Sequence, residues 1–102
     1  MVKRIIRVGA SWCGPCKVFA LTFKKASEMP EFKNIQFESV DIDEDEDMMV
    51  EKFGIRTVPT TVLLDKNDEP IYKIIGNVSL NDFVRVINTA SGKGNEIEEE
   101  VW

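Results

Sequence analysis

The chain has no histidine, and only two of its 102 residues are cysteine. Without histidine, Cys–His nucleophilic catalysis is excluded, and a closed zinc site is short of its usual four ligands. No apolar run approaches the roughly 18 residues that a membrane helix needs. Residues 1–7 also contain no long apolar stretch of the signal-peptide type. We therefore expect no membrane association, no metal site and a location in the cytoplasm.

The net charge and the length of the chain restrict the possible partners and the number of domains. The 13 basic and 18 acidic residues give a formal net charge of -5, which repels the phosphate backbone of a nucleic acid. A length of 102 residues, with 43% of them hydrophobic, fits one soluble domain with a modest core. Because cytoplasmic structural thiols are kept reduced, two cysteines spaced Cys-x-x-Cys indicate redox catalysis or metal binding.

Hydrophobic periodicity and turn residues predict seven elements in the order β-α-β-α-β-β-α. Strands are expected at residues 2–8, 35–42, 60–64 and 71–75. Helices are expected from Pro15 up to Pro30, around Met48 with Gly54 as its C-terminal cap, and after a capping box formed by Ser79 and Asp82.

This element order predicts an α/β fold with a four-stranded mixed sheet flanked by helices. The first two strands should be parallel through a helical crossover, and the last two should form an antiparallel hairpin. We expect residues 1–90 to form the single domain and residues 91–102 to be an acidic tail.

The sequence Trp12-Cys13-Gly14-Pro15-Cys16 carries the strongest chemical signal. At a strand-to-helix junction, the unpaired amides of the first helical turn stabilise an anion on the sulfur of Cys13, the predicted nucleophile. Cys16 lies one turn later and is the predicted resolving thiol, so the only cofactor is the reversible Cys13–Cys16 disulfide. Gly14 permits the tight turn, Pro15 suits the helix start, and Trp12 shields one side. A structural cysteine pair and half of a metal site are the weaker alternatives.

A second motif, Thr57-Val58-Pro59-Thr60, places a proline directly before a strand. We predict a cis Val58–Pro59 bond, which leaves the backbone of Val58 free to pair with a substrate strand. An ordinary trans turn is the alternative from the proline alone.

Taken together, the sequences at 12–16 and 54–60 and the glycine at position 76 resemble the thioredoxin family. The resemblance covers about Ile5 to Ala90 and implies the minimal thioredoxin fold, starting at what looks like the family's second strand. It implies that the first cysteine is an exposed nucleophile. It also implies the substrate-binding residues Trp12, Gly14, Pro15, Val58, Pro59 and Gly76.

The same resemblance implies a monomeric thiol-disulfide oxidoreductase that reduces protein disulfides. Glycine and proline between the cysteines indicate the reducing branch of the family, with a thioredoxin reductase or an equivalent dithiol donor as the electron source. Two alternatives stay open from the sequence. One is a binding or chaperone module that acts independently of its thiols, and the other is a metal carrier that uses Cys13 and Cys16 across a dimer.

Three positions depart from the family pattern. Arg7 stands where the family usually has a buried acid that takes the proton from the second cysteine, Ser39 replaces its common lysine partner, and Leu21 replaces a helix-kinking proline. If the guanidinium of Arg7 reaches the cysteines, it favours a thiolate, and the first thiol should be unusually acidic. Alternatively, Arg7 extends outward along its stem and its charge never reaches the sulfurs.

Overall fold

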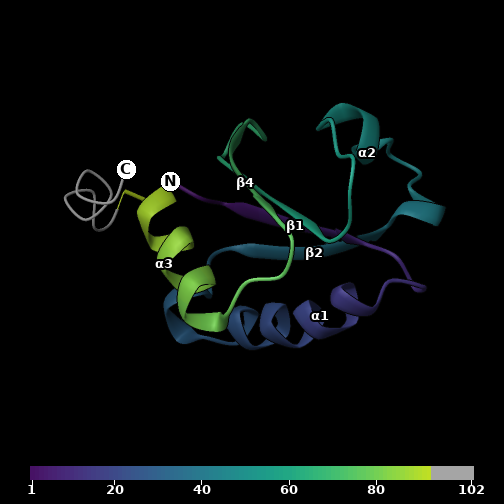
Figure 1. The fold of residues 1–102 in the computed structure, drawn as a ribbon. Helices are drawn as coiled ribbons and strands as arrows, with labels where there is room; N and C mark the ends of the chain where they lie inside the picture. The colour runs from purple at the N-terminus through teal and green to yellow at the C-terminus, as the bar shows by residue number, and fades with distance from the viewer. Residues whose placement is uncertain (93–102) are drawn as a thin grey trace.

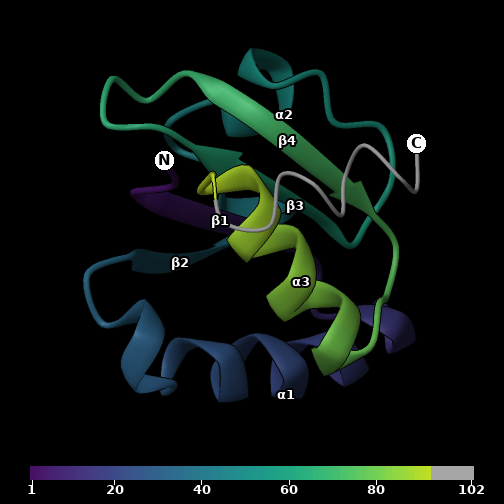
Figure 2. The same ribbon diagram turned by 90° about the vertical axis from the view of Figure 1, so that its left-hand side faces the viewer.

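Four strands form one mixed sheet in the computed structural model, which describes residues 1–92 (Figures 1 and 2). The strands are β1 (Arg4–Gly9), β2 (Gln36–Asp41), β3 (Thr60–Leu64) and β4 (Pro70–Ile75), in the spatial order β2-β1-β3-β4. Strand β1 is parallel to β2, while the β1–β3 and β3–β4 pairs are antiparallel. The predicted fold class and strand directions are confirmed.

Helices cover both faces of this sheet. Helices α1 (Gly14–Ser27) and α3 (Leu80–Ala90) lie on one face and contact each other, and the short helix α2 (Met49–Lys52) lies on the other (Figure 1). Two 3-10 turns, Pro30–Phe32 and Ile42–Glu44, come before and after β2. Within residues 1–92, no helix is long and apolar enough to cross a membrane.

The alternation of side chains along β1 divides the core into two clusters. Ile5 packs into the cluster under α1 and α3, whereas Ile6 and Val8 pack toward α2. The first cluster has the buried residues Val2, Ile5, Phe19, Phe23, Ala26, Phe32, Leu63, Ile74, Phe83 and Ile87. The second has Ile6, Val8, Met49, Phe53, Ile55, Val62 and Leu64. Burial on both faces makes β1 and β3 the rigid centre of the sheet.

Helix α1 begins where the sequence predicts. Pro15 occupies its first turn, and Cys16, Phe19, Phe23 and Ala26 form its buried face at helical spacing. Two lysines in the last turn face the negative end of the helix dipole, which favours termination at Ser27. The buried face fixes how α1 lies on the sheet and therefore where its first turn points.

Both ends of α2 are stabilised by residues that lie next to the helix in the sequence. The carboxylate of Asp45 accepts hydrogen bonds of 2.8 Å from the amides of Met49 and Val50, which would otherwise be unpaired. Gly54 follows α2 with a φ of +62°, the left-handed conformation that glycine adopts most readily. The acidic segment before α2 forms a 3-10 turn and a cap, so the predicted helix is shorter than its sequence pattern indicates.

The N-terminus of α3 forms only half of the predicted capping box. The hydroxyl of Ser79 accepts a hydrogen bond of 3.1 Å from the amide of Asp82. The carboxylate of Asp82 pairs instead with Arg85, one turn later. In a full capping box, a glutamate at this position would hydrogen-bond to the backbone amide of the N-cap residue. The aspartate side chain is shorter, and here it forms an ion pair with Arg85 instead. Most of the predicted tail, residues 93–102, lies outside the described residues.

Candidate active site

Cys13 and Cys16 form a disulfide at the junction between β1 and α1. Cys13 is the N-cap of α1, and its Sγ accepts a hydrogen bond of 3.1 Å from the amide of Cys16. The Cα atoms of the two cysteines are 5.3 Å apart, a normal span for a disulfide. An N-cap sulfur receives the amide and the positive end of the helix dipole, so this position stabilises a thiolate.

Both cysteines are buried in the disulfide form. Cys13 is 6% exposed and Cys16 is 2% exposed. They pack with Ala10, and the partly buried side chains of Ile42 and Val58 cover them. The family resemblance implies an exposed first cysteine, and the structure differs because the N-cap position holds the sulfur of Cys13 over the first turn.

The proline loop meets the first cysteine. The Val58–Pro59 bond is cis, as predicted, and the carbonyl oxygen of Val58 lies 3.8 Å from Sγ of Cys13. The carbonyl of Pro59 accepts a hydrogen bond of 2.9 Å from the amide of Gly76, which has a φ of +92°. Within residues 1–92, Val58 forms no backbone hydrogen bond. The cis-proline loop therefore contacts the sulfur of Cys13 on one side and the backbone of Gly76 on the other.

Trp12 lies at the outer edge of this site. Its side chain is 65% exposed, and its indole Nε1 donates a hydrogen bond of 3.1 Å to the carboxylate of Asp43. Gly14 and Pro15 are exposed beside it at the start of α1. The sequence analysis missed Asp43 because it lies in an acidic run that is indistinguishable from solvated surface.

Arg7 points inward, under α1. Its Nη2 donates a hydrogen bond of 3.1 Å to the hydroxyl of Ser39, and its Cζ lies 5.6 Å from the ring centroid of Phe23. Burial lowers the pKa of the Arg7 guanidinium, which still remains protonated at neutral pH. The guanidinium of the half-buried Arg7 therefore lies between the ring of Phe23 and the neighbouring strand, on the side of the sheet that α1 covers.

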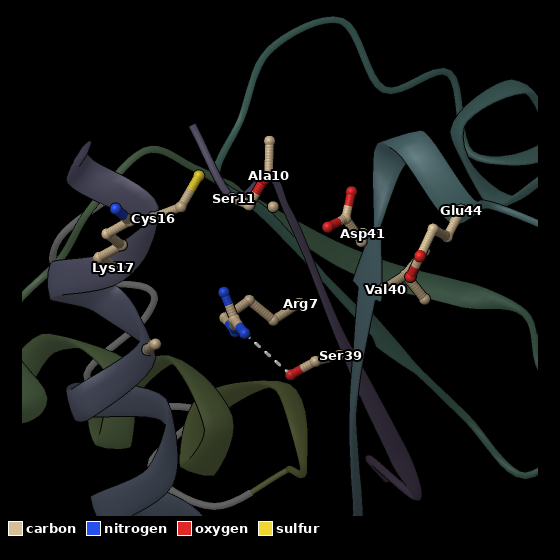
Figure 3. A pocket seen from close by; sticks show the side chains of 11 residues that line it. Arg7, Ala10, Ser11, Cys16, Lys17, Ser39, Val40, Asp41 and Glu44 are labelled. Carbon is tan, nitrogen blue, oxygen red and sulfur yellow. Dashed lines mark hydrogen bonds between the residues drawn. The ribbon is translucent and has the colours of Figure 1, made fainter. Parts of the chain in front are cut away.

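A cavity of about 380 Å³ separates Arg7 from the start of α1 (Figure 3). Arg7 and Cys16 both line it, with Lys17 on the helix side and Asp41 and Glu44 on the side of β2. Gly9 also lines the cavity, and the sequence analysis gave this residue no functional role. A glycine that ends a strand just before a reactive motif can signal a close backbone approach.

Comparison with known proteins shows to which family the chain belongs. The family model described as Thioredoxin matches residues 2–89. The chain belongs to the thioredoxin family. Thioredoxin Asp f 29 of Aspergillus fumigatus is 35% identical over 72 residues, covering 71% of this chain and 64% of that thioredoxin. The thioredoxin of Malassezia sympodialis is 38% identical over 72 residues, covering 71% of this chain and 67% of that thioredoxin. The chain thus spans about two thirds of the length of these two relatives.

The solved structures agree with this family. The crystal structure of Malassezia sympodialis thioredoxin (Mala s 13) matches with a TM-score of 0.73 and 31% identity. The match covers 85% of this chain and 74% of that thioredoxin. The four-stranded mixed sheet with its three helices is therefore the thioredoxin fold, as the sequence predicts.

Proposed function

We propose that this chain is a thiol-disulfide oxidoreductase that reduces protein disulfides. The observation that carries the proposal is the position of the Cys13–Cys16 disulfide, with the sulfur of Cys13 as the N-cap of α1. The cis-proline loop supports it, because Val58 makes no backbone–backbone hydrogen bond within residues 1–92 and its carbonyl lies beside that sulfur. An extended substrate segment can pair with such a backbone while its disulfide meets Cys13.

In the proposed cycle, the thiolate of Cys13 attacks one sulfur of the substrate disulfide. The substrate S–S bond breaks, one substrate sulfur leaves with the electron pair, and that thiolate takes a proton from water. Cys16 then attacks Sγ of Cys13 in the mixed disulfide and releases the second substrate thiol. Two electrons pass to the substrate, and the Cys13–Cys16 disulfide remains. An external dithiol donor, thioredoxin reductase or an equivalent, restores the dithiol.

Insulin reduction with a small dithiol as electron donor tests this proposal. We expect Cys13→Ser to abolish turnover, because a hydroxyl at that position cannot open a disulfide. We expect Cys16→Ser to accumulate mixed disulfides, because attack still occurs and resolution does not. Ser27→Ala, at the far end of the same helix, serves as the control and should keep the parental rate.

Parental turnover by Cys13→Ser would contradict the role of Cys13 as the nucleophile. Absence of turnover by the parental protein would instead support a binding module that acts independently of its thiols. Absence of any covalent adduct in Cys16→Ser would contradict the assigned division of roles. Two further parts of the proposal are a monomeric state, tested by light scattering, and a cytoplasmic location, tested by subcellular fractionation.

A further inference from the structure

A polar row crosses three strands directly beneath α1. Arg7 is the register partner of Ser39 on β2 and of Thr61 on β3, so the three residues lie side by side across the sheet. Ser39 accepts one hydrogen bond from Arg7, whereas Nε of Arg7 and the hydroxyl of Thr61 are buried without a partner within residues 1–92. No carboxylate of the described residues forms an ion pair with Arg7. Within the described residues, its positive charge therefore has no negatively charged partner in direct contact.

This charge lies close to the second cysteine. A Cβ atom placed on Gly9 would be 3.1 Å from Nη1 of Arg7 and 3.4 Å from Sγ of Cys16. The sum of these distances sets an upper limit of about 6.5 Å between Nη1 and the sulfur. Figure 3 shows the guanidinium and the sulfur of Cys16 lining the same cavity, and the glycine at position 9 leaves that space open.

Other charges also face this cavity and must be weighed against Arg7. Lys17 of α1 adds a second positive charge, while Asp41 of β2 and Glu44 of the following 3-10 turn contribute negative ones. Lys17 and Glu44 are exposed, so water screens them strongly, and Asp41 is half-buried with one carboxylate oxygen bonded to the amide of Asp43. Arg7 is the positive charge held beneath the helix, where screening is weaker.

We propose that Arg7 lowers the pKa of the Cys16 thiol and so promotes the resolving step. This inference rests on the proposed function and concerns the same site. A guanidinium cannot accept a proton, so Arg7 acts on the sulfur through its charge, and the thiol proton of Cys16 passes to water through the cavity. The Cys16 thiolate then attacks Sγ of Cys13, and the substrate thiolate leaves with the electrons of the broken bond. Arg7 is thus a positioning residue, not a general base.

This arrangement separates the control of the two thiols. The Cys16 amide and the dipole of α1 act on Cys13, whereas Arg7 acts on Cys16 from below. At about 6.5 Å, with a dielectric between that of a protein surface and that of water, one charge shifts a pKa by about one unit. A shift of this size is measurable on a single thiol.

The test titrates Cys16 alone, in a Cys13→Ser background, by the ultraviolet absorbance of its thiolate. This background removes the coupling between the two sulfurs. We expect Arg7→Gln to raise the pKa of Cys16 by about one unit, and Arg7→Lys to restore part of the difference. Arg4→Gln is the matched control: Arg4 lies on the same strand, pairs with Glu38 and Asp68, and does not line the cavity. It should leave the titration unchanged.

A second pair of variants keeps the test valid if Arg7→Gln does not fold. Ser39 is exposed, so substitutions there are tolerated more easily than in the core. In the same Cys13→Ser background, Ser39→Asp places a carboxylate beside the Arg7 guanidinium and should raise the pKa of Cys16. Ser39→Asn is the uncharged control and should not. An unchanged pKa in both folded Arg7→Gln and Ser39→Asp would overturn the proposal.

Kinetics on the two-cysteine protein separate this inference from the proposed function. A mixed disulfide between Cys13 and a chromogenic aromatic thiol releases that thiol when Cys16 attacks. Below the pKa of Cys16, Arg7→Gln lowers the thiolate fraction about tenfold but raises its intrinsic nucleophilicity about threefold, so release should slow about threefold. An unchanged rate refutes the role of Arg7 alone, whereas no release by the parental protein refutes the proposed function.

Discussion

Substitution of Gly9 by alanine perturbs the contact between the central strand and the resolving cysteine. The new methyl group would lie 3.1 Å from Nη1 of Arg7, 3.3 Å from Cβ of Cys16 and 3.4 Å from its Sγ. The arginine end can move by a few tenths of an ångström at small cost. Cβ of Cys16 cannot, because the backbone of α1 fixes it. The substitution therefore presses on the first turn of the active-site helix.

The magnitude follows from these distances. Overpacking of a tight site costs about 1 to 3 kcal/mol. The Cβ contact is rigid in both redox states and the Sγ contact only in the disulfide, so we take the lower part of that range. Alanine also restricts the unfolded chain more than glycine does, which offsets about 0.5 kcal/mol. The net expectation is a loss of about 1 kcal/mol in the free energy of unfolding. The loss should be larger in the disulfide form, because a reduced Cys16 can turn its sulfur away from the methyl group.

Urea unfolding of the oxidised and reduced proteins measures both parts of this prediction. If the disulfide form loses about 0.5 to 1 kcal/mol more than the dithiol form, the reduction potential rises by about 10 to 20 mV. Gly14→Ala is the matched control, since no heavy atom other than those of its two chain neighbours lies within 4 Å of a Cβ built there. It should leave stability unchanged or raise it slightly. Parental stability of Gly9→Ala in both redox states would refute the close-contact argument.

Four other substitutions test separate features of the fold. Thr61→Val should leave the free energy of unfolding unchanged or raise it by up to about 1 kcal/mol, because the buried Thr61 hydroxyl lacks a partner within residues 1–92. Thr60→Val should lower it by about 1 kcal/mol, because the Thr60 hydroxyl donates a 2.7 Å hydrogen bond to the Thr57 carbonyl. Ser79→Ala should cost about 1 kcal/mol by removing the α3 cap, measured by thermal unfolding. Backbone hydrogen bonds from Glu69 and Asn67 lower the pKa of Asp65, so its stabilising effect is present above its unfolded pKa of about 3.9 and is lost as the pH falls through its folded pKa. Asp65→Asn should flatten that acid limb, and an unchanged limb would contradict the assignment.

The fold was predictable because its elements are specified locally. The helical spacing of Phe19, Phe23 and Ala26 requires one buried face, and the β-branched run 60–64 reads as a strand whatever surrounds it. Turn residues at 65–68 then set the antiparallel hairpin. The observed ends of the helices and strands differ from the predicted ends by one or two residues. Sequence patterns do not show where a capping residue or a 3-10 turn ends a helix.

The contacts of the site depend on distances between segments, which periodicity does not encode. A sequence can place Arg7 on a strand, but whether its long side chain turns under α1 or out to water depends on the ring of Phe23 and the hydroxyl of Ser39. The hydrogen bond between Trp12 and Asp43 could not be predicted for the same reason. In the sequence both residues resemble solvated surface, and only the folded structure brings the loop of Trp12 next to the 3-10 turn of Asp43.

The charge at position 7 has a direct consequence for the redox balance. The disulfide carries no charge, whereas the dithiol can ionise, so any group that stabilises a thiolate favours the reduced form. The amide of Cys16 acts in this direction on Cys13, and Arg7 is placed to act in the same direction on Cys16. A buried carboxylate at the same position would oppose a thiolate. Both effects favour the reduced form, so the same arginine that promotes resolution also makes the disulfide easier to reduce.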